Sequence, residues 1–310
     1  MEFFKKKTSI RFMGRRRVAM VFSAVLIVGS LVSLFVKGLN FGIDFTGGTV
    51  IEVKYPQPVD LGHVRDALSA KYSDAQAQYF GTARDVMIRI APRPGESSAQ
   101  LSDKVLATLQ TATPGVTMQR VEFVGPQVGS ELATKGGLAL LYTVIGILIY
   151  VMIRFEWRLS VGAVVAMIHD PVITLGVFSL FHIQFDLTVL AAVLAVIGYS
   201  INDTVVVYDR IRENFRKLRK QSAPEIMDIS INETLSRTIM TSLATLLVVL
   251  AMYFIGGPVI HGFALALIIG ILVGTYSSIY VASAIALDLG VSKSDLVPVR
   301  KDNAPADDRP

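Results

Sequence analysis

Long stretches without a single charged residue constrain the fold of this chain more than any other feature of its sequence. Four of them, residues 18–36, 136–153, 238–255 and 262–287, are entirely uncharged. Two more, residues 159–181 and 187–208, are uncharged apart from His169, Asp170 and Asp203. A helix rises about 1.5 Å per residue, so each stretch can cross the ~30 Å hydrocarbon core of a bilayer. The sequence therefore predicts a polytopic α-helical membrane protein with six transmembrane helices.

Positively charged residues lie between these stretches and predict the orientation of the chain. Lysine and arginine gather in the tail 1–17, in the short connection after the second span and in the loop 209–237. Because cytoplasmic loops carry the excess of Lys and Arg, these segments and the tail 288–310 are expected in the cytoplasm. Residues 37–135 then form a domain on the other side, since long domains translocate regardless of their charges.

The net charge of +5 is explained by this distribution of lysine and arginine. Attraction to anionic lipid headgroups accounts for the excess better than binding to nucleic acid does. The first span is expected to stay uncleaved, because its 19 residues are too many for the apolar core of a signal peptide. The segment 209–233 is amphipathic and basic, which favours a position along the bilayer surface.

Residues 37–135 predict a small α/β domain. Strands are expected at residues 49–55, 75–80, 85–90 and 116–124 and helices at 59–72 and 98–111, from their alternating and helical apolar spacing. The order β-α-β-β-α-β is that of a ferredoxin-like fold. No GxSxG or HExxH motif is present, so we expect a docking domain and not an enzyme. The segment 41–48 is glycine-rich, yet it lacks the spacing of a phosphate loop and predicts only a turn.

Asp203 is the strongest candidate for a functional residue inside the membrane. It shares a helix face with Ala195, Tyr199 and Ser200 by the three-and-four rule. A carboxylate within a span is costly and suggests a proton or ion path. Arg237 stands just before the fifth span and is expected to reach Asp203, so that its approach or withdrawal would switch proton uptake and release. The alternative is a static ion pair that holds two helices together.

Two further features of the spans carry predictions. His169 and Asp170 precede Pro171 within the third span, where they either extend the proton route or satisfy a proline kink. They are weak metal candidates because no further His or Cys has suitable spacing, and neither a metal nor a cofactor is expected. In the sixth span a stripe of small residues predicts close helix packing. Its first members are Gly262, Ala266, Gly270 and Gly274.

Several segments resemble the SecF family, the six-span subunits of SecDF protein-export complexes in the RND superfamily. They are Phe-Gly-Ile-Asp-Phe-Thr-Gly-Gly at 41–48, Val-Gly-Pro at 124–126, Gly-Ser-Glu-Leu at 129–132, Arg-Thr at 237–238, Gly-Gly-Pro at 256–258 and, above all, the run from Ile-Gly-Tyr-Ser-Ile-Asn-Asp to Arg-Glu-Asn at 197–214. These segments occur in the family's order over nearly the whole chain.

The resemblance implies half of an RND-type transporter in the bacterial inner membrane, with residues 37–135 in the periplasm. It implies pairing with SecD into a twelve-span unit beside SecYEG, with SecA and YajC as further partners. SecD and SecF would use proton flow to pull or release an unfolded preprotein after SecA has started its transfer. Asp203 would be the proton-binding carboxylate and Arg237 its partner, and SecD would supply a second carboxylate.

Two functions of other classes stay open. A drug or lipid exporter of the same superfamily would need a large apolar cavity in the exported domain, which has few aromatic residues. A non-transporting scaffold of a translocon would use Asp203 only as an anchor. Proton uptake by reconstituted vesicles separates the scaffold from the transporters, and crosslinking to a preprotein separates the export subunit from the drug exporter.

Overall fold

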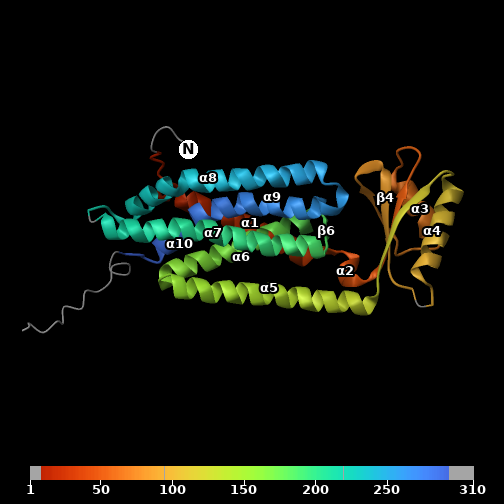
Figure 1. The fold of residues 1–310 in the computed structure, drawn as a ribbon, viewed down its shortest axis with the longest axis horizontal. Helices are drawn as coiled ribbons and strands as arrows, with labels where there is room; N and C mark the ends of the chain where they lie inside the picture. The colour runs from red at the N-terminus through yellow and green to blue at the C-terminus, as the bar shows by residue number, and fades with distance from the viewer. Residues whose placement is uncertain (1–7, 94, 219, 293–310) are drawn as a thin grey trace, which may run out of the picture.

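The computed structural model describes residues 8–93, 95–218 and 220–292. Figure 1 shows long helices running side by side, with a small α/β domain at one end of the bundle. We name this the domain end and the opposite one the distal end. The first and the last described segments meet at the distal end, where Arg16 Nε lies 3.1 Å from Asp288 Oδ1.

Six helical segments are long and apolar enough to cross a membrane. They are α1 (Arg16–Lys37), α5 (Pro126–Arg154), α6 (Trp157–Leu180), α7 (Leu187–Lys217), α8 (Ala223–Ile255) and a last span that joins α9 (Pro258–Ser277), the π-helical turn η2 (Ser278–Ala282) and α10 (Ser283–Asp288). A short 3-10 turn, η1 (Met13–Arg15), precedes α1. The prediction of six spans from the uncharged stretches is confirmed.

Helices α6 and α7 form the centre of the bundle. In their most apolar stretches 56% and 50% of the residues are buried, against 11% in α1, α5 and α8. The outer helices therefore keep most of their apolar side chains on the surface of the bundle. Such a surface is stable only where lipid or another protein covers it.

Close contact between α1 and α6 depends on small residues. A Cβ atom added to Gly176 of α6 would lie 2.7 Å from the Cα atom of Ser30 in α1. One turn further along, Ser33 Oγ and Ser179 Oγ are 2.9 Å apart and form a hydrogen bond. Without a Cβ at position 176 the two backbones approach closely enough for this polar contact in an apolar surrounding.

The small-residue stripe of the last span lies against α7 of the same chain. A Cβ atom added to Gly262 would lie 2.9 Å from Val189 Cγ2, and one added to Gly270 only 2.1 Å from Val196 Cγ2. At Gly274 the neighbour is Ser200, whose Cβ would be 3.2 Å away. Ala266, between them, is fully buried. The stripe therefore brings α9 close to the helix that carries Asp203.

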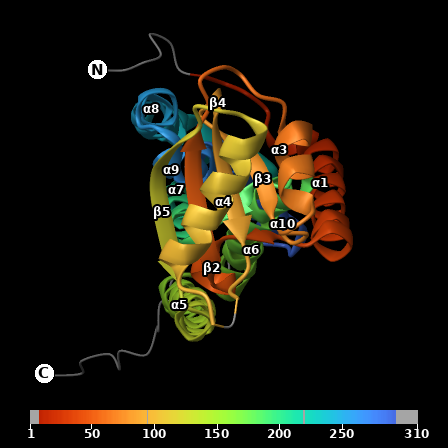
Figure 2. The ribbon, with the colours of Figure 1, turned by 90° about the vertical axis from the view of Figure 1, so that its right-hand side faces the viewer.

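The α/β domain has the predicted ferredoxin-like order, which is confirmed. Its elements are β2 (Gly48–Lys54), α3 (Leu61–Ser69), β3 (Gln76–Phe80), β4 (Thr82–Ile90), α4 (Ser98–Ala112) and β5 (Thr117–Val124). The strands pair antiparallel in the order β3-β4-β2-β5. Figure 2 shows α3 and α4 in front of the sheet and the bundle behind it.

The core of this domain lies between the sheet and its two helices. Ile51, Val86 and Ile88 of the strands pack with Leu68 of α3 and Val105 of α4, and all are almost fully buried. Both helices begin at a capping residue. Asp60 accepts a hydrogen bond from the Gly62 N–H, and Ser97 forms a capping box with Gln100. The local sequence rules for a helix start therefore hold here.

A short junction joins the bundle to the domain. Strand β1 (Asn40–Phe41) pairs in parallel with β6 (Gln184–Phe185), which lies just before α7. The short helix α2 (Ile43–Thr46) follows β1 and leads into β2. The glycine-rich segment 41–48, expected only as a turn, thus contains a strand residue and a helical turn.

The structure differs from the expectation for the segment 209–233. Most of its described residues extend two long helices, where the sequence predicted a loop over 209–237. Its first part continues α7 to Lys217 and its second part belongs to α8 from Ala223 onward. Helical spacing of apolar residues is the same in both arrangements, so the sequence pattern did not distinguish them.

The contact between α1 and α6 leads to a first prediction. Gly176→Ala should destabilise the protein by about 1–3 kcal/mol, because α1 must move away from α6 to accommodate the methyl group. The thermal unfolding midpoint of the detergent-solubilised protein measures this loss. Gly146→Ala in α5 is the control, since nothing lies within 4 Å of a Cβ there. Equal midpoints for the two variants would contradict the close packing.

Candidate functional site

Asp203 lies on α7 inside the bundle and is 3% exposed. Its Oδ2 atom is buried and has no hydrogen-bond partner among the described residues. The groups of α8 that interact with the carboxylate are Ser242 and the positive charge of Arg237. Arg237 is exposed at the surface of α8, and no ion pair between it and Asp203 occurs in the described part of the chain. The static pair considered from the sequence is therefore not formed in this structure.

A chain of hydroxyl groups joins α7, α8 and α9 near this acid. Tyr199 donates a hydrogen bond of 3.4 Å to Ser242 Oγ, which lies 2.8 Å from Thr275 Oγ1. Thr238, one turn before Ser242 on α8, is also buried, and its hydroxyl has no partner among the described residues. Asp203 therefore faces a polar side of α8, and not a purely apolar wall.

Asp170 on α6 is fully buried and lies at the centre of a second polar group. Its Oδ1 atom is 2.8 Å from His169 Nδ1. Its Oδ2 atom accepts hydrogen bonds from Ser200 Oγ of α7 and from Ser277 Oγ of α9, the latter at 2.8 Å. Three helices thus meet at one carboxylate, while Nε2 of His169 stays buried without a partner among the described residues.

The two carboxylates belong to one polar layer of the bundle. Ser200, which donates to Asp170, is three residues before Asp203 on the same face of α7. Gly274 allows this arrangement, because a Cβ there would lie 3.2 Å from Ser200 Cβ and 3.4 Å from Asp170 Oδ2. From the sequence, Asp170 was a weaker candidate than Asp203 for the proton route. In the structure, Asp170 makes more hydrogen bonds than Asp203 does.

Several contributors were not identified from the sequence. Ser277 and Thr275 reach the polar layer from α9. The stripe of small residues around them predicted close helix packing, but nothing in the sequence indicated a polar role for these two hydroxyl groups. Tyr208 of α7 is fully buried, and its hydroxyl donates a hydrogen bond of 2.9 Å to the carbonyl oxygen of Ala282. That carbonyl belongs to the π-helical turn η2, and such turns are frequent near functional sites.

The chemistry available here is the binding of protons. A buried carboxylic acid can be neutral or charged, and the balance depends on nearby positive groups and hydroxyls. Among residues 8–93, 95–218 and 220–292 no group of three His, Cys, Asp or Glu side chains could hold a metal ion. The His169 and Asp170 pair with two serines offers too few strong ligands for such an ion.

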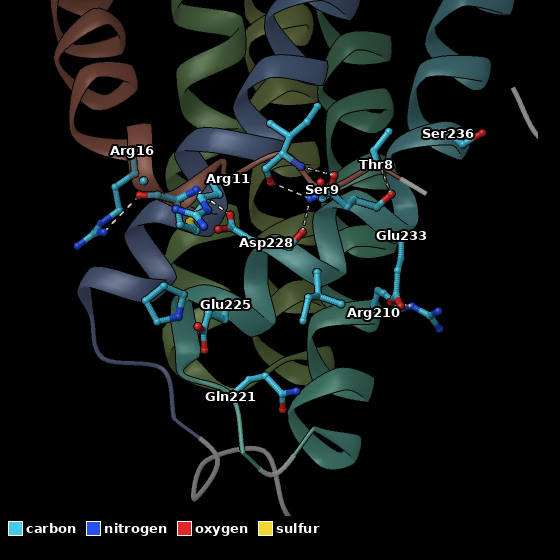
Figure 3. A pocket seen from close by; sticks show the side chains of 16 residues that line it. Thr8, Ser9, Arg11, Arg16, Arg210, Gln221, Glu225, Asp228, Glu233 and Ser236 are labelled. Carbon is cyan, nitrogen blue, oxygen red and sulfur yellow. Dashed lines mark hydrogen bonds and ion pairs between the residues drawn. The ribbon is translucent and has the colours of Figure 1, made fainter. Parts of the chain in front are cut away.

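An open cavity of about 1070 Å³ lies at the distal end and does not reach these acids. Figure 3 shows it between the N-terminal segment, the end of α7 and the start of α8, with Arg11, Arg210, Glu225 and Asp228 among its lining residues. The Met13 N–H donates a hydrogen bond of 2.8 Å to Asp228 Oδ1, which anchors the N-terminal segment to α8. Neither Asp203 nor Asp170 lines it.

Comparison with known proteins places this arrangement in a family. Residues 104–292 match the family described as protein export membrane protein SecD/SecF, C-terminal, and residues 32–59 match the SecD/SecF GG motif. The protein translocase subunit SecF of Vibrio alginolyticus is 53% identical, over 100% of this chain and 99% of its own length. The protein of the same name from Pseudomonas aeruginosa is 50% identical, over 97% and 98% of the two chains.

A solved structure supports the same assignment. The crystal structure of SecDF, a translocon-associated membrane protein from Thermus thermophilus, matches with a TM-score of 0.84 and 37% identity. The match covers 93% of this chain and 39% of that longer chain. These relatives are translocase subunits and not hydrolases or redox enzymes, and the six-span, RND-type fold is confirmed. The chain therefore belongs to the SecD/SecF family of protein-export membrane proteins, among its SecF members.

Proposed function

We propose that this chain assists the late steps of preprotein translocation by passing protons through Asp203. The observation that carries the proposal is the 3% exposure of this carboxylate, together with an Oδ2 atom that has no partner in the described part of the chain. An ionised carboxylate left in this state inside a membrane is costly. A residue that only holds helices together would be expected to have its hydrogen bonds satisfied.

The relay depends on the distance between α7 and α8. Burial favours the protonated form of a carboxylic acid, whereas a nearby guanidinium favours the ionised form. Movement of Arg237 toward Asp203 would release the proton, and its withdrawal would allow uptake. Each charge that crosses contributes about 2.3 kcal/mol per 100 mV of membrane potential. This energy is sufficient to shift a conformational equilibrium between two helix arrangements.

Asp170 has a different role in this proposal. Its two oxygens already have three partners from α6, α7 and α9. A satisfied buried network specifies one arrangement of helices and is costly to break. We therefore assign Asp170 and His169 to the framework that positions α7, with a minor share in proton transfer.

The orientation follows from the charges of the bundle. Arg16, Arg154, Arg210 and Arg212 lie at the distal end. Because Lys and Arg mark the cytoplasmic side, our proposal is that this end and both termini face the cytoplasm of a bacterial cell. Residues 37–135 would then be periplasmic, where they would meet the emerging preprotein.

The proposed partners follow from the relatives' names and from the resemblance of the motifs. The name SecDF, and the 39% of that chain which this one covers, are in line with our proposal that SecD contributes a second six-span half. The apolar outer surfaces of α1, α5 and α8 are available for such a half. SecYEG, SecA and YajC are the further partners of this proposal, and the substrate is an unfolded preprotein.

The orientation can be tested because the chain contains no cysteine. Thr82→Cys in the α/β domain should react with a membrane-impermeant maleimide in spheroplasts. Gln221→Cys at the distal end should react only after the membrane is opened. Labelling of position 221 alone in closed spheroplasts would show the reverse orientation.

The relay predicts that Asp203→Asn abolishes proton uptake and proton-driven export. Asparagine keeps the shape of the side chain but cannot be ionised, so the protein should remain folded. Proton uptake by vesicles that contain the complex with its twelve-span partner measures the effect, and export of a preprotein gives a second reading. Proton uptake at the original rate in this variant would rule out Asp203 as the carrier.

Asp170→Asn should affect stability more than transport. The amide keeps one acceptor oxygen and replaces the other with an NH₂ group, so the three partners of Asp170 share a single acceptor oxygen. The cost is about 1–3 kcal/mol for each buried group left unsatisfied. Its unfolding midpoint in detergent should fall below that of Asp203→Asn, while proton uptake by the folded fraction persists. A variant with normal stability and no uptake would instead place Asp170 in the relay.

A further inference from the structure

The segment 41–48 is not used by the proton relay, yet it contacts both the bundle and the α/β domain. It comprises the end of β1, the short helix α2 and the first residue of β2. On the bundle side it lies against the N-terminus of α7. On the other side it leads directly into the sheet.

Asp44 connects this segment to α7. Its Oδ2 atom accepts a hydrogen bond of 3.0 Å from the backbone N–H of Leu187, the first residue of that helix. Asp186 is already the N-cap of α7, and its Oδ1 atom accepts the Val189 N–H at 2.9 Å. The helix therefore has a capping residue of its own, and Asp44 supplies a second carboxylate from a distant part of the chain. This second contact joins two elements and is not needed to start the helix.

Backbone contacts hold Asp44 in place. The Gly42 N–H donates a hydrogen bond of 2.8 Å to the Phe185 carbonyl oxygen, next to the parallel pairing of β1 with β6. The Phe45 and Phe185 rings stack with centroids 5.7 Å apart. Residue 42 must be small, because a Cβ there would lie 3.2 Å from Asp186 Cβ. The segment and the start of α7 therefore form one packed unit.

The same segment is fixed to the α/β domain. Gly47 and Gly48 have φ values of +69° and +129°. A Cβ atom at Gly48 would lie 2.7 Å from the Ile90 carbonyl oxygen of β4. One at Gly47 would lie 3.3 Å from the Val124 carbonyl oxygen of β5 and 2.9 Å from Pro126 Cα, where β5 leads into α5. Larger residues would force the segment away from the sheet. Arg89 of β4 also donates a hydrogen bond to the Phe41 carbonyl oxygen.

We propose that the segment 41–48 couples the state of Asp203 to the α/β domain, with Asp44 as the positioning residue at the contact with α7. Asp203 and Leu187 belong to one uninterrupted helix, so a shift of α7 near the acid also moves its N-terminus. The Asp44 contact passes this movement to the segment, and the two glycines pass it to β2. This inference rests on the proposed proton relay and adds the route by which that relay acts on the domain.

The coupling is mechanical and not electrostatic. The titratable and charged groups of other helices near Asp203 and its polar layer are Arg237 of α8 and the pair His169 and Asp170 of α6, with Tyr276 of α9 beside the His169 ring. None of them belongs to the segment 41–48. Loss of the Asp44 side chain should therefore leave proton binding at Asp203 intact. It should interrupt only the movement of the α/β domain that follows proton binding.

The test compares Asp44→Ala and Asp44→Asn in the complete complex in vesicles. Asp44→Ala should lower the rate of preprotein export at least about fivefold, the lower range of typical coupling energies, with proton uptake unchanged. Asp44→Asn keeps an acceptor oxygen for the Leu187 N–H and should retain most of the export. Asp60→Ala is the matched control, because it removes an Asp side chain that caps α3 within the α/β domain by accepting the Gly62 N–H.

A distance measurement shows whether the movement is transmitted. Spin labels at Gln119→Cys in β5 and Val259→Cys in α9 report the position of the domain on the bundle. Adding Asp203→Asn, which fixes the acid in a neutral form, should shift the distance distribution, and Asp44→Ala should remove that shift.

An unchanged shift and unchanged export in Asp44→Ala would overturn the coupling while the relay stands. Loss of proton uptake in Asp44→Ala would also overturn it. Proton uptake that does not depend on Asp203 would refute the proposed function itself.

Discussion

The burial of two carboxylates within helices surrounded by lipid determines how the rest of this bundle is built. A charge in a medium of low polarity is costly unless hydrogen bonds or opposite charges compensate it. Asp170 meets this requirement with three partners from three helices, whereas Oδ2 of Asp203 has no partner among the described residues. Asp170, whose hydrogen bonds are satisfied, therefore belongs to the framework of the bundle. Asp203, with one oxygen unpartnered in the described part of the chain, is the acid whose protonation can change. The glycines of α9 serve the same requirement, because they bring Ser200 and Ser277 within reach of Asp170.

Helix α7 links the parts of the molecule that matter for the proposed activity. Its middle carries Ser200 and Asp203, its far part packs Tyr208 against the last span, and its first residue is held by Asp44. Along α9 its neighbours include Gly262, Gly270 and Gly274, which allow close contact between the two helices. A helix fixed at its start and polar at its centre is suited to transmit small displacements. The outer helices, by contrast, are mostly exposed and are suited to contact lipid or a partner subunit.

Much of this organisation could be predicted from the sequence because it is local. Uncharged stretches revealed six spans, alternating residues revealed the strands, and Asp203 was conspicuous as a charge in an apolar helix. The contacts that define the site are not local. Ser277 lies 107 residues from Asp170, and Asp44 lies 143 residues from Leu187. No spacing rule connects such positions. The segment 209–233 shows another limit, since its helical periodicity is the same whether it lies along a bilayer or extends two long helices.

The π-helical turn in the last span has a consequence for how this helix divides its surface. In the sequence the small residues recur every fourth position from Gly262 through Ala286, as though one continuous ridge faced one neighbour. The wider turn between Ser278 and Ala282 inserts an additional residue into the helical repeat and rotates everything after it. Along this span, α9 packs most extensively on α7 and also on α8, while η2 and α10 pack most extensively on α6. A single span therefore contacts both central helices, and the change of main neighbour falls at the wider turn.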